Sequence, residues 1–223
     1  MSYRERPARP DGAIAWTRMP GPGEVRVLPD GCMDLLWADG ALFVAGPDTQ
    51  AKVHEAGKHF AGLRFAPGAA PALLNVPAVE LRDQRVPLAA VWPDAVARRL
   101  AEQVGDDADP ALALERLVAL SPPEPWVQTL VEGLRTGGSV AAAADAGHLS
   151  ERQLHRRCLA LFGYGAKTLA RVLRMERAVD LARGGMAFGS VAAAAGYADQ
   201  AHLARDVKDL AGVPLRRLTQ VGG

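Results

Sequence analysis

The second half of the chain contains a repeat with a period of 49 residues. Residues 151–169 align with residues 200–218, and the alignment pairs five identical residues. The pairs are Leu154 with Leu203, Arg156 with Arg205, Leu161 with Leu210, Gly163 with Gly212, and Leu169 with Leu218. A fixed period of this length indicates one supersecondary unit that is used twice.

Each copy follows an alanine-rich segment and a short break in the helical pattern. The segments are Val140–Ala146 and Val191–Ala195, and the breaks are Gly147-His148 and Gly196-Tyr197. A short helix, a tight turn and a second helix form a helix-turn-helix. Two such units, about one helical turn of DNA apart, predict contacts to neighbouring stretches of the major groove.

The repeated part of the chain is also its basic part. Residues 1–137 hold 14 Lys and Arg against 18 Asp and Glu, whereas residues 138–223 hold 12 against 7. Positive charge is what phosphate binding requires, although a run of charged residues is more often simply a solvated surface. At 223 residues the chain is long enough for two compact domains or one large one.

From Ala13 to Phe65, short apolar runs alternate with turn motifs. Asp30-Gly31 and Asp39-Gly40 favour hairpins because glycine, and to a lesser degree aspartate, tolerates the positive φ of tight primed turns. A meander of six short strands predicts a small barrel or sandwich. The predicted strands are Ala13–Arg18, Glu24–Leu28, Cys32–Trp37, Ala41–Ala45, Gln50–His54 and His59–Phe65.

Beyond Pro67-Gly68 the apolar spacing becomes helical. Asp94 and Asp109 are expected to be N-caps, the latter before a proline at the first helical position. We place the domain boundary at residue 121, beside Pro122-Pro123, which gives a β-rich domain with trailing helices (1–121) and an all-α domain (122–223). The fold class is α+β multidomain. The predicted helices are Asp94–Val104, Pro110–Leu120 and Glu124–Arg135.

In the first repeat, Ser150 and Gln153 form a capping-box motif that begins a helix over Glu151–Leu161. Helical spacing places three residues of this helix inward and leaves four polar ones for base edges. Arginine suits guanine, glutamine suits adenine, and histidine donates to purine acceptors. The alternative is that these four residues are solvated surface. The inward residues are Leu154, Cys158 and Leu161, and the candidate DNA-binding residues are Arg152, Gln153, His155 and Arg156.

In the second repeat, Asp199 is the expected N-cap of a helix over Gln200–Leu210. Asp206 and Asp209 would repel phosphate if they faced the DNA backbone, so this helix is expected to add affinity more than sequence discrimination. The inward residues are Leu203, Val207 and Leu210, and the candidate DNA-binding residues are Gln200, His202 and Arg205.

One long helix over Lys167–Arg183 is expected to join the two repeats, since its apolar residues keep helical rhythm without glycine or proline. Glu176 is a candidate for an ion pair with Arg174 or Arg177. The alternative is that these charges are simply the exposed surface of a linker helix.

The C-terminal part resembles the DNA-binding domain of the AraC-type family of bacterial transcription regulators over roughly 122–220. The resemblance lies in Leu-Ser-Glu-Arg-Gln-Leu-His-Arg (149–156), Phe-Gly-Tyr-Gly (162–165), Leu-Arg-Met-Glu-Arg-Ala (173–178), Gly-Tyr-Ala-Asp-Gln-Ala-His-Leu-Ala-Arg (196–205) and Gly-Val-Pro (212–214). It implies base contacts by Arg152, His155 and Arg156, with Gln200, His202 and Arg205 in the corresponding places of the second unit. Members usually carry an aromatic residue where this chain has Cys158, Leu203 and Val207, which implies a lighter core here.

The N-terminal half is similar to the small β-rich, cupin-like sensor domains that precede such DNA-binding domains. The similarity lies in Pro-Asp-Gly-Cys-Met-Asp-Leu-Leu-Trp (29–37), Gly-Pro-Asp-Thr (46–49) and Arg-Phe-Ala-Pro-Gly (64–68). It implies regulation through a small-molecule effector or a homodimer contact, and contact with RNA polymerase if the protein is an activator. We expect a cytoplasmic protein with no cofactor and no membrane partner, because the chain lacks the long apolar run of a membrane span.

Two rival readings concern the first half. A cupin-like enzyme would need several converging metal ligands, and this half offers His54, His59 and scattered acids such as Glu55, so we expect neither a metal site nor enzymatic activity. Alternatively, this half is only a dimerisation module. Four aromatic residues are expected either to line an apolar pocket or to form the hydrophobic core of this half: Trp16, Trp37, Trp92 and Phe65.

The two cysteines, Cys32 and Cys158, show no metal-ligand spacing and are expected to be reduced and buried. For Cys32 the alternative is a thiol sensor, because the Asp30-Gly31 turn just before it would leave a thiol within reach of solvent.

Overall fold

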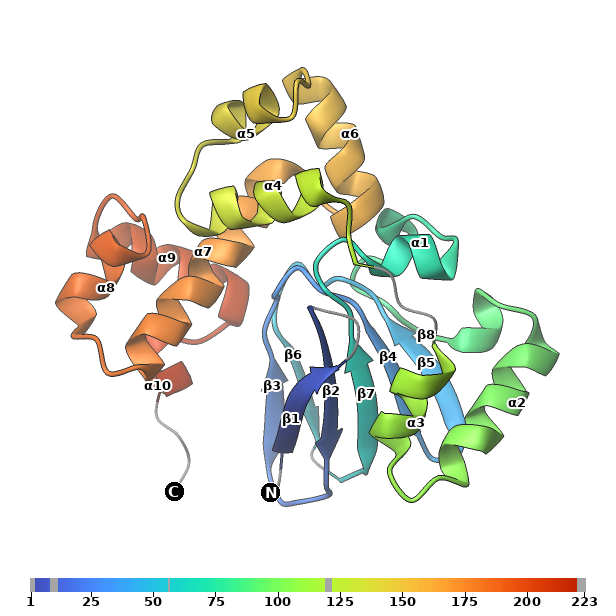
Figure 1. Ribbon diagram of the computed structural model, residues 1–223. Helices are drawn as coiled ribbons and strands as arrows, with labels where there is room; N and C mark the ends of the chain where they lie inside the picture. The colour runs from blue at the N-terminus through green and yellow to red at the C-terminus, as the bar shows by residue number, and fades with distance from the viewer. Residues whose placement is uncertain (1–2, 9–11, 56, 119–121, 220–223) are drawn as a thin grey trace.

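The structure, a computed structural model, describes residues 3–8, 12–55, 57–118 and 122–219. The first part of the chain forms two antiparallel sheets, and the last part forms a group of helices that lies above one end of them and beside the smaller sheet (Figure 1). All six predicted strands are confirmed, with ends that differ by at most two residues. They are β2 (Ala13–Arg18), β3 (Glu24–Val27), β4 (Asp34–Ala38), β5 (Ala41–Ala45), β6 (Lys52–Glu55) and β7 (Phe60–Arg64).

Two further strands, β1 (Tyr3–Ala8) and β8 (Arg85–Pro87), lie at the two edges of the larger sheet. This sheet has the order β1-β2-β7-β4-β5-β8, and the smaller sheet pairs β3 with β6. Neither edge strand was predicted. β1 is rich in arginine and β8 has only three residues next to a proline, so neither shows a strand-like apolar alternation.

The two faces of the larger sheet have different roles. Because side chains alternate along a strand, Ala61 and Leu63 of β7 face one side, whereas Phe60 and Arg64 face the other. The first side forms a hydrophobic core with two helices, α2 (Asp94–Gly105) and α3 (Pro110–Leu117). The second side, together with the smaller sheet, surrounds a cavity.

The connecting helices agree with the sequence except at their ends. Between β7 and α2 lie α1 (Ala70–Leu74), η1 (Ala78–Glu80) and η2 (Leu88–Ala90). Asp109 caps α3 as predicted, since its side chain accepts hydrogen bonds from two backbone amides. The N-cap assignment of Asp94 is wrong: Pro93 occupies that position, and Asp94 lies in the first turn, paired with Arg98 at 2.9 Å. Helix α3 ends before Leu120, and the boundary proposed at residue 121 falls outside the described residues.

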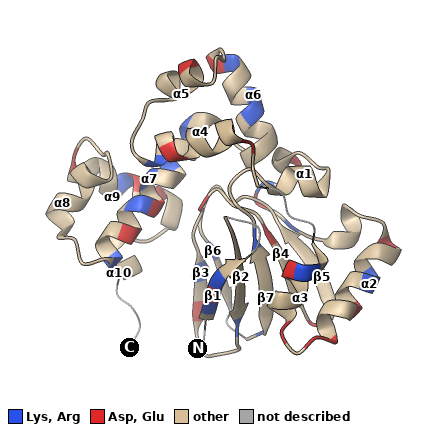
Figure 2. Cartoon of the chain, viewed as in Figure 1, with Lys and Arg blue, Asp and Glu red and all other residues tan. Residues whose placement is uncertain are grey.

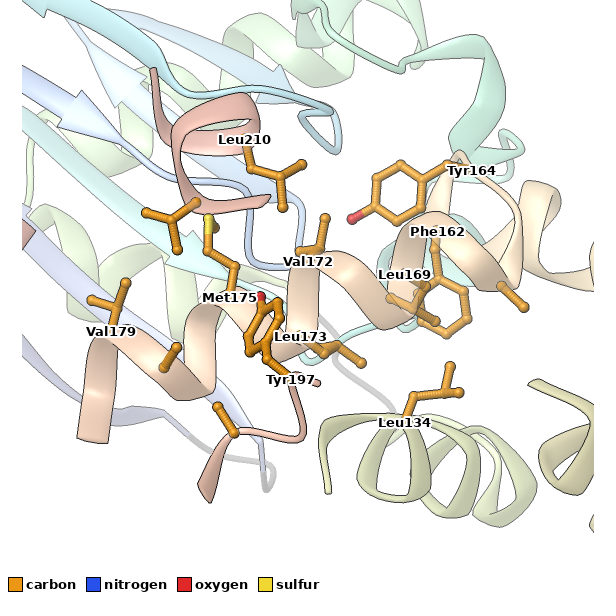
Figure 3. Close-up of a cluster of buried hydrophobic side chains, with 14 of the residues drawn as sticks. Leu134, Phe162, Tyr164, Leu169, Val172, Leu173, Met175, Val179, Tyr197 and Leu210 are labelled. Atoms are coloured by element: carbon orange, nitrogen blue, oxygen red, sulfur yellow. The ribbon is translucent and has the colours of Figure 1, made fainter. Parts of the chain in front are cut away.

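The C-terminal helices pack around one central helix, α7 (Ala166–Arg183), which contacts helices on both sides of it. Leu169, Val172, Leu173 and Met175 of this helix are almost completely buried (Figure 3). The predicted long connecting helix is therefore confirmed, and it acts as the core of the domain. The surrounding helices are α4 (Pro125–Arg135), α5 (Val140–Ala146), α6 (Glu151–Phe162), α8 (Phe188–Ala194), α9 (Gln200–Ala211) and α10 (Leu215–Thr219).

Candidate nucleic-acid interface

The first helix-turn-helix unit consists of α5 and α6. The predicted capping box is present: Ser150 Oγ accepts a hydrogen bond from the Gln153 amide at 3.3 Å, and Gln153 Oε1 accepts one from the Ser150 amide at 2.9 Å. These bonds satisfy amides that the first turn of a helix leaves free. They also occupy the carboxamide oxygen of Gln153, so only its NH₂ group is free for a base.

The inward face of α6 follows the predicted spacing up to its last turn. Leu154 and Cys158 are buried, whereas Leu161 is only half-buried and Phe162 fills the core at the end of the helix. Burial raises the pKa of the Cys158 thiol to about 12, which keeps it protonated. The core of this unit therefore contains an aromatic residue, although not at the position of Cys158.

Arg152 and Arg156 are exposed on α6, and neither has a carboxylate within ion-pair distance among the described residues. Figure 2 shows basic residues along the part of α6 that lies near α5. His155 is also exposed, but its ring lies against Gly165 in the turn that leads into α7. Two guanidinium groups are thus free to bind phosphate or guanine, and the histidine lies at the side of this surface.

The second unit consists of α8 and α9. Asp199 caps α9 as predicted, accepting a hydrogen bond from the His202 amide at 2.6 Å. Leu203, Val207 and Leu210 are buried as expected. The helix ends at Gly212 with φ of 72°, just as α6 ends at Gly163 with φ of 76°, so the 49-residue repeat extends to the left-handed C-caps.

The candidate DNA-binding residues of α9 differ more in their exposure to solvent than those of α6. Gln200 and Arg205 are exposed, and Arg205 has no ion-pair partner among the described residues. His202 is half-buried, with its ring edge-to-face on Tyr197 at 5.1 Å between centroids and its Nε2 3.9 Å from Asp206. The structure therefore turns His202 partly toward the core.

The two acidic residues of α9 that could repel phosphate, Asp206 and Asp209, form ion pairs with α7. Arg171 binds Asp206 at 2.9 Å and Asp209 at 2.6 Å, and Arg174 approaches Asp206 at 3.6 Å. Asp206 is only 8 % exposed. This network could not be predicted from the sequence, because Arg171 and Asp206 lie 35 positions apart and their distance depends on how α7 crosses α9. The expected repulsion of phosphate is therefore much reduced.

Glu176 also differs from the expectation. Its partner is Arg135 of α4, at 2.9 Å, rather than Arg174 or Arg177. Arg174 is directed to Asp206 and lies over the Tyr197 ring, and Arg177 donates to the backbone oxygen of Arg135. Burial raises the pKa of Glu176 to about 7, and Arg135 opposes that change.

The turns of the two units differ by one residue. In the first, Gly147 ends α5 with φ of −86° and His148 takes the left-handed conformation, with φ of 50°. In the second, Ala195 ends α8 and Gly196 takes the left-handed conformation, with φ of 80°. The left-handed residues of the two turns, His148 and Gly196, are therefore 48 positions apart, although the helices that follow keep the 49-residue shift.

The C-terminal ends of α6 and α9 contact the β-rich part of the chain. Arg82 donates to the Gly163 oxygen at 3.3 Å, Arg26 donates to the Ala211 oxygen at 2.9 Å, and the Ala51 amide donates to the Leu210 oxygen at 2.7 Å. These donors satisfy carbonyl groups that a helix end leaves free. In helix-turn-helix proteins the N-terminal residues of the reading helix contact the bases, and here those ends lie away from these contacts.

Two protein families match the chain. A family described as a helix-turn-helix domain matches residues 143–220, and a domain of unknown function, DUF6597, matches residues 13–87. The first match spans the reading helices of both helix-turn-helix units and agrees with the resemblance of this part of the chain to AraC-type DNA-binding domains. With its β-rich partner domain, the chain has the architecture of a DNA-binding transcription regulator.

Two solved structures of ToxT from Vibrio cholerae share this fold. One, in the P21 form, has a TM-score of 0.54 with 9% identity, and the alignment covers 100% of both chains. The other, an apo variant from strain SCE256, has a TM-score of 0.52 with 8% identity, covering 97% of this chain and 100% of ToxT. No curated protein matches the chain in sequence. The structural likeness to ToxT therefore extends over both the β-rich part and the helical part of this chain.

The remaining sequence candidates are separated in the structure. His54 lines the cavity, whereas His59 lies beside Trp37 on another surface, and no three His, Cys, Asp or Glu side chains of the described residues converge as metal ligands would. Cys32 also lines the cavity, and burial with the nearby Asp30 raises its thiol pKa well above its usual value, which disfavours a reactive thiolate.

The four aromatic candidates divide between pocket and core. Trp16 lines the cavity, whereas Phe65, Trp37 and Trp92 belong to the hydrophobic core or pack against it. Within the described ranges no helix is both long and apolar enough to cross a bilayer.

Proposed function

We propose that α6 and α9 bind neighbouring stretches of the major groove of a specific DNA site, and that the β-rich domain controls how the two helices are presented. The observation that best supports this proposal is the orientation of α6 and α9. Their C-terminal carbonyls accept hydrogen bonds from the β-rich domain, while Arg152 and Arg156 are free at the other end of α6. A charged residue near the start of a reading helix is well placed to contact base edges.

The residues proposed to contact DNA are Arg152, Gln153, His155 and Arg156 in α6, and Gln200, His202 and Arg205 in α9. The geometry supports different roles among them. Arg152, Arg156 and Arg205 are exposed and unpaired among the described side chains, and so are suited to guanine or phosphate. Gln153 and His202 are partly engaged within the protein, so we assign them smaller contributions.

The β-rich domain can control α6 and α9 through the hydrogen bonds that it donates to their C-terminal ends. The donors that hold the ends of α6 and α9 come from β3, from the β5–β6 connection and from the segment after η1. A change in the position of these segments would alter the angle between the two reading helices. We propose a small-molecule effector or a second copy of the chain as the cause of such a change, and contact with RNA polymerase if the protein is an activator.

The test is a selection of genomic DNA fragments by the full chain, followed by sequencing, at two salt concentrations. We expect a compact motif for the wild type and its loss in Arg152→Ala/Arg156→Ala. Arg98→Ala is the matched control, since Arg98 lies on α2 and its one ion pair with a described residue is with Asp94. Enrichment of no motif, or the same motif from the double variant, would contradict base reading by α6.

A further inference from the structure

The cavity of the β-rich domain lies between its two sheets and has a charged interior. The cavity volume is about 70 Å³, which is room for a few water molecules and therefore suits only a small ligand. Apolar parts of the wall come from Trp16, Val27, Leu36 and Phe60. Unlike a hydrophobic core, the same wall also carries several ionisable side chains.

Most of these charges have partners. Arg64 lies between two carboxylates, with its Nε 3.2 Å from Asp30 and 3.5 Å from Asp34. Asp34 also accepts a hydrogen bond from the Trp16 indole at 2.7 Å. Lys58 binds Asp39 at 2.6 Å, at a more exposed place. Asp48 has Lys52 at 4.0 Å.

Arg18 and Arg85 are the exceptions among the charged side chains described around this cavity. Neither makes an ion pair or a hydrogen bond with another described residue, and Arg18 Nε is buried from solvent without a partner. Instead, the Arg18 guanidinium lies 5.5 Å from the Trp16 ring centre, and the Arg85 guanidinium, at the exposed edge strand, lies 5.5 Å from that of Phe60.

The unpaired positive charge of the cavity is therefore at Arg18 and Arg85, although Asp30, Asp34 and Asp48 also line it. Burial lowers the pKa of Arg18, and the neighbouring Arg64 and Arg85 lower it further. Burial also lowers the pKa of His54, with Arg85 and Arg18 adding to the effect. A half-buried guanidinium without an acceptor costs folding free energy, and such arrangements are typical of ligand sites.

We propose that this cavity binds a small organic carboxylate, whose charged group lies between Arg18 and Arg85 and whose apolar part contacts Trp16 and Phe60. Guanidinium groups bind planar carboxylates through paired hydrogen bonds, which explains the choice of arginine. Phosphate shares this chemistry. The apolar and aromatic wall favours an organic anion, because inorganic phosphate would leave that surface without contacts.

One segment of the cavity wall also packs against the DNA-binding domain. In the β3–β4 connection, Asp30 and Cys32 line the cavity, while Gly31 lies against α7, where a Cβ would be 3.4 Å from Leu169 Cδ1. Leu28 packs against the core of the C-terminal domain. A ligand that draws Arg64 away from Asp30 would move this connection and α7 together. This last step rests on the proposed function, whereas ligand binding does not.

The test is calorimetric titration of the full chain, without DNA, with benzoate, hexanoate, benzamide and inorganic phosphate. We expect a carboxylate to bind, its neutral amide to bind at least about tenfold more weakly, and Arg18→Gln or Arg85→Gln to weaken carboxylate binding by a similar factor. Arg98→Gln on α2 is the control and should bind as the wild type does. No binding of either carboxylate, or tighter binding of phosphate, would overturn the proposal.

A second readout separates a binding role from a structural one. Because Arg18 has no acceptor, Arg18→Gln should leave the midpoint of denaturant unfolding unchanged or raise it in the ligand-free protein. Loss of stability together with unchanged benzoate binding would assign Arg18 to the fold and overturn the site. Since neither measurement uses DNA, failure here is distinguishable from failure of DNA reading, which the fragment selection reports.

Discussion

The two helix-turn-helix units share one sequence pattern but use their second helices differently. In α6 the exposed arginines Arg152 and Arg156 have no protein partner among the described residues, so their charge faces solvent. In α9 two acidic residues bind Arg171 and Arg174 of α7, which fixes that helix to the core. A duplicated unit can thus keep its caps and apolar spacing while its polar residues diverge between reading and anchoring.

The largest expected effect concerns the anchor of α9. Asp206→Ala should lower the free energy of unfolding by about 2 kcal/mol, because Arg174 loses its carboxylate partner and Arg171 keeps only Asp209, an effect moderated by the partial exposure of Arg171. The matched change in the first unit is Arg157→Ala, 49 positions earlier, where the guanidinium lies over the half-buried Trp126 ring.

Arg157→Ala should cost less than about 1 kcal/mol. Denaturant unfolding of both variants measures the difference. Equal losses at the two positions would mean that the units are anchored alike, and the distinction between them would be wrong.

The next effect concerns DNA. Arg152→Ala should weaken binding to the selected motif by about 1–3 kcal/mol and relax specificity at one base position. Arg205→Ala should weaken binding to all sequences about equally and reduce the salt slope by about 1. Fluorescence anisotropy with the motif and a scrambled duplex, over a salt series, tests both. A specificity change in Arg205→Ala alone would reverse the roles assigned to α6 and α9.

Removing the N-cap of either reading helix should have a smaller effect on stability, and this effect should be equal in the two units. Ser150→Ala and Asp199→Ala each remove the acceptor for an amide in the first turn of a reading helix. Both should lower the free energy of unfolding by about 1 kcal/mol. Ser139→Ala, which removes the cap of α5, provides a comparison outside the reading helices. A loss in only one unit would show that the capping pattern is not equivalent between them.

Local patterns predicted much of this fold, and contacts distant in sequence account for most of what they missed. The capping motifs at Ser150, Asp109 and Asp199 involve residues within three positions, so their geometry follows from the sequence itself. The pairing of Arg135 with Glu176 and that of Arg171 with Asp206 depend on how helices cross, and residue spacing within one helix contains no such information.

The same division holds for the candidate sites. Helical spacing correctly left Arg152, Arg156 and Arg205 exposed, but it did not show that His202 packs on Tyr197. The cavity arginine Arg18 was missed because its strand reads as an ordinary alternating segment. Only the approach of the smaller sheet turns that face into an enclosed wall.

The smallest effects concern the turns, where the repeat shifts by one residue. Gly147 has an ordinary φ, and a Cβ there would meet only van der Waals contacts, so Gly147→Ala should raise the free energy of unfolding by about 0.5 kcal/mol. Gly196 needs its positive φ, so Gly196→Ala should lower the free energy of unfolding by about 1 kcal/mol. Thermal unfolding of the two variants gives the signs. Effects of the same sign would restore the simple 49-residue alignment of the turns, whereas opposite signs would show that His148, not Gly147, takes the place of Gly196.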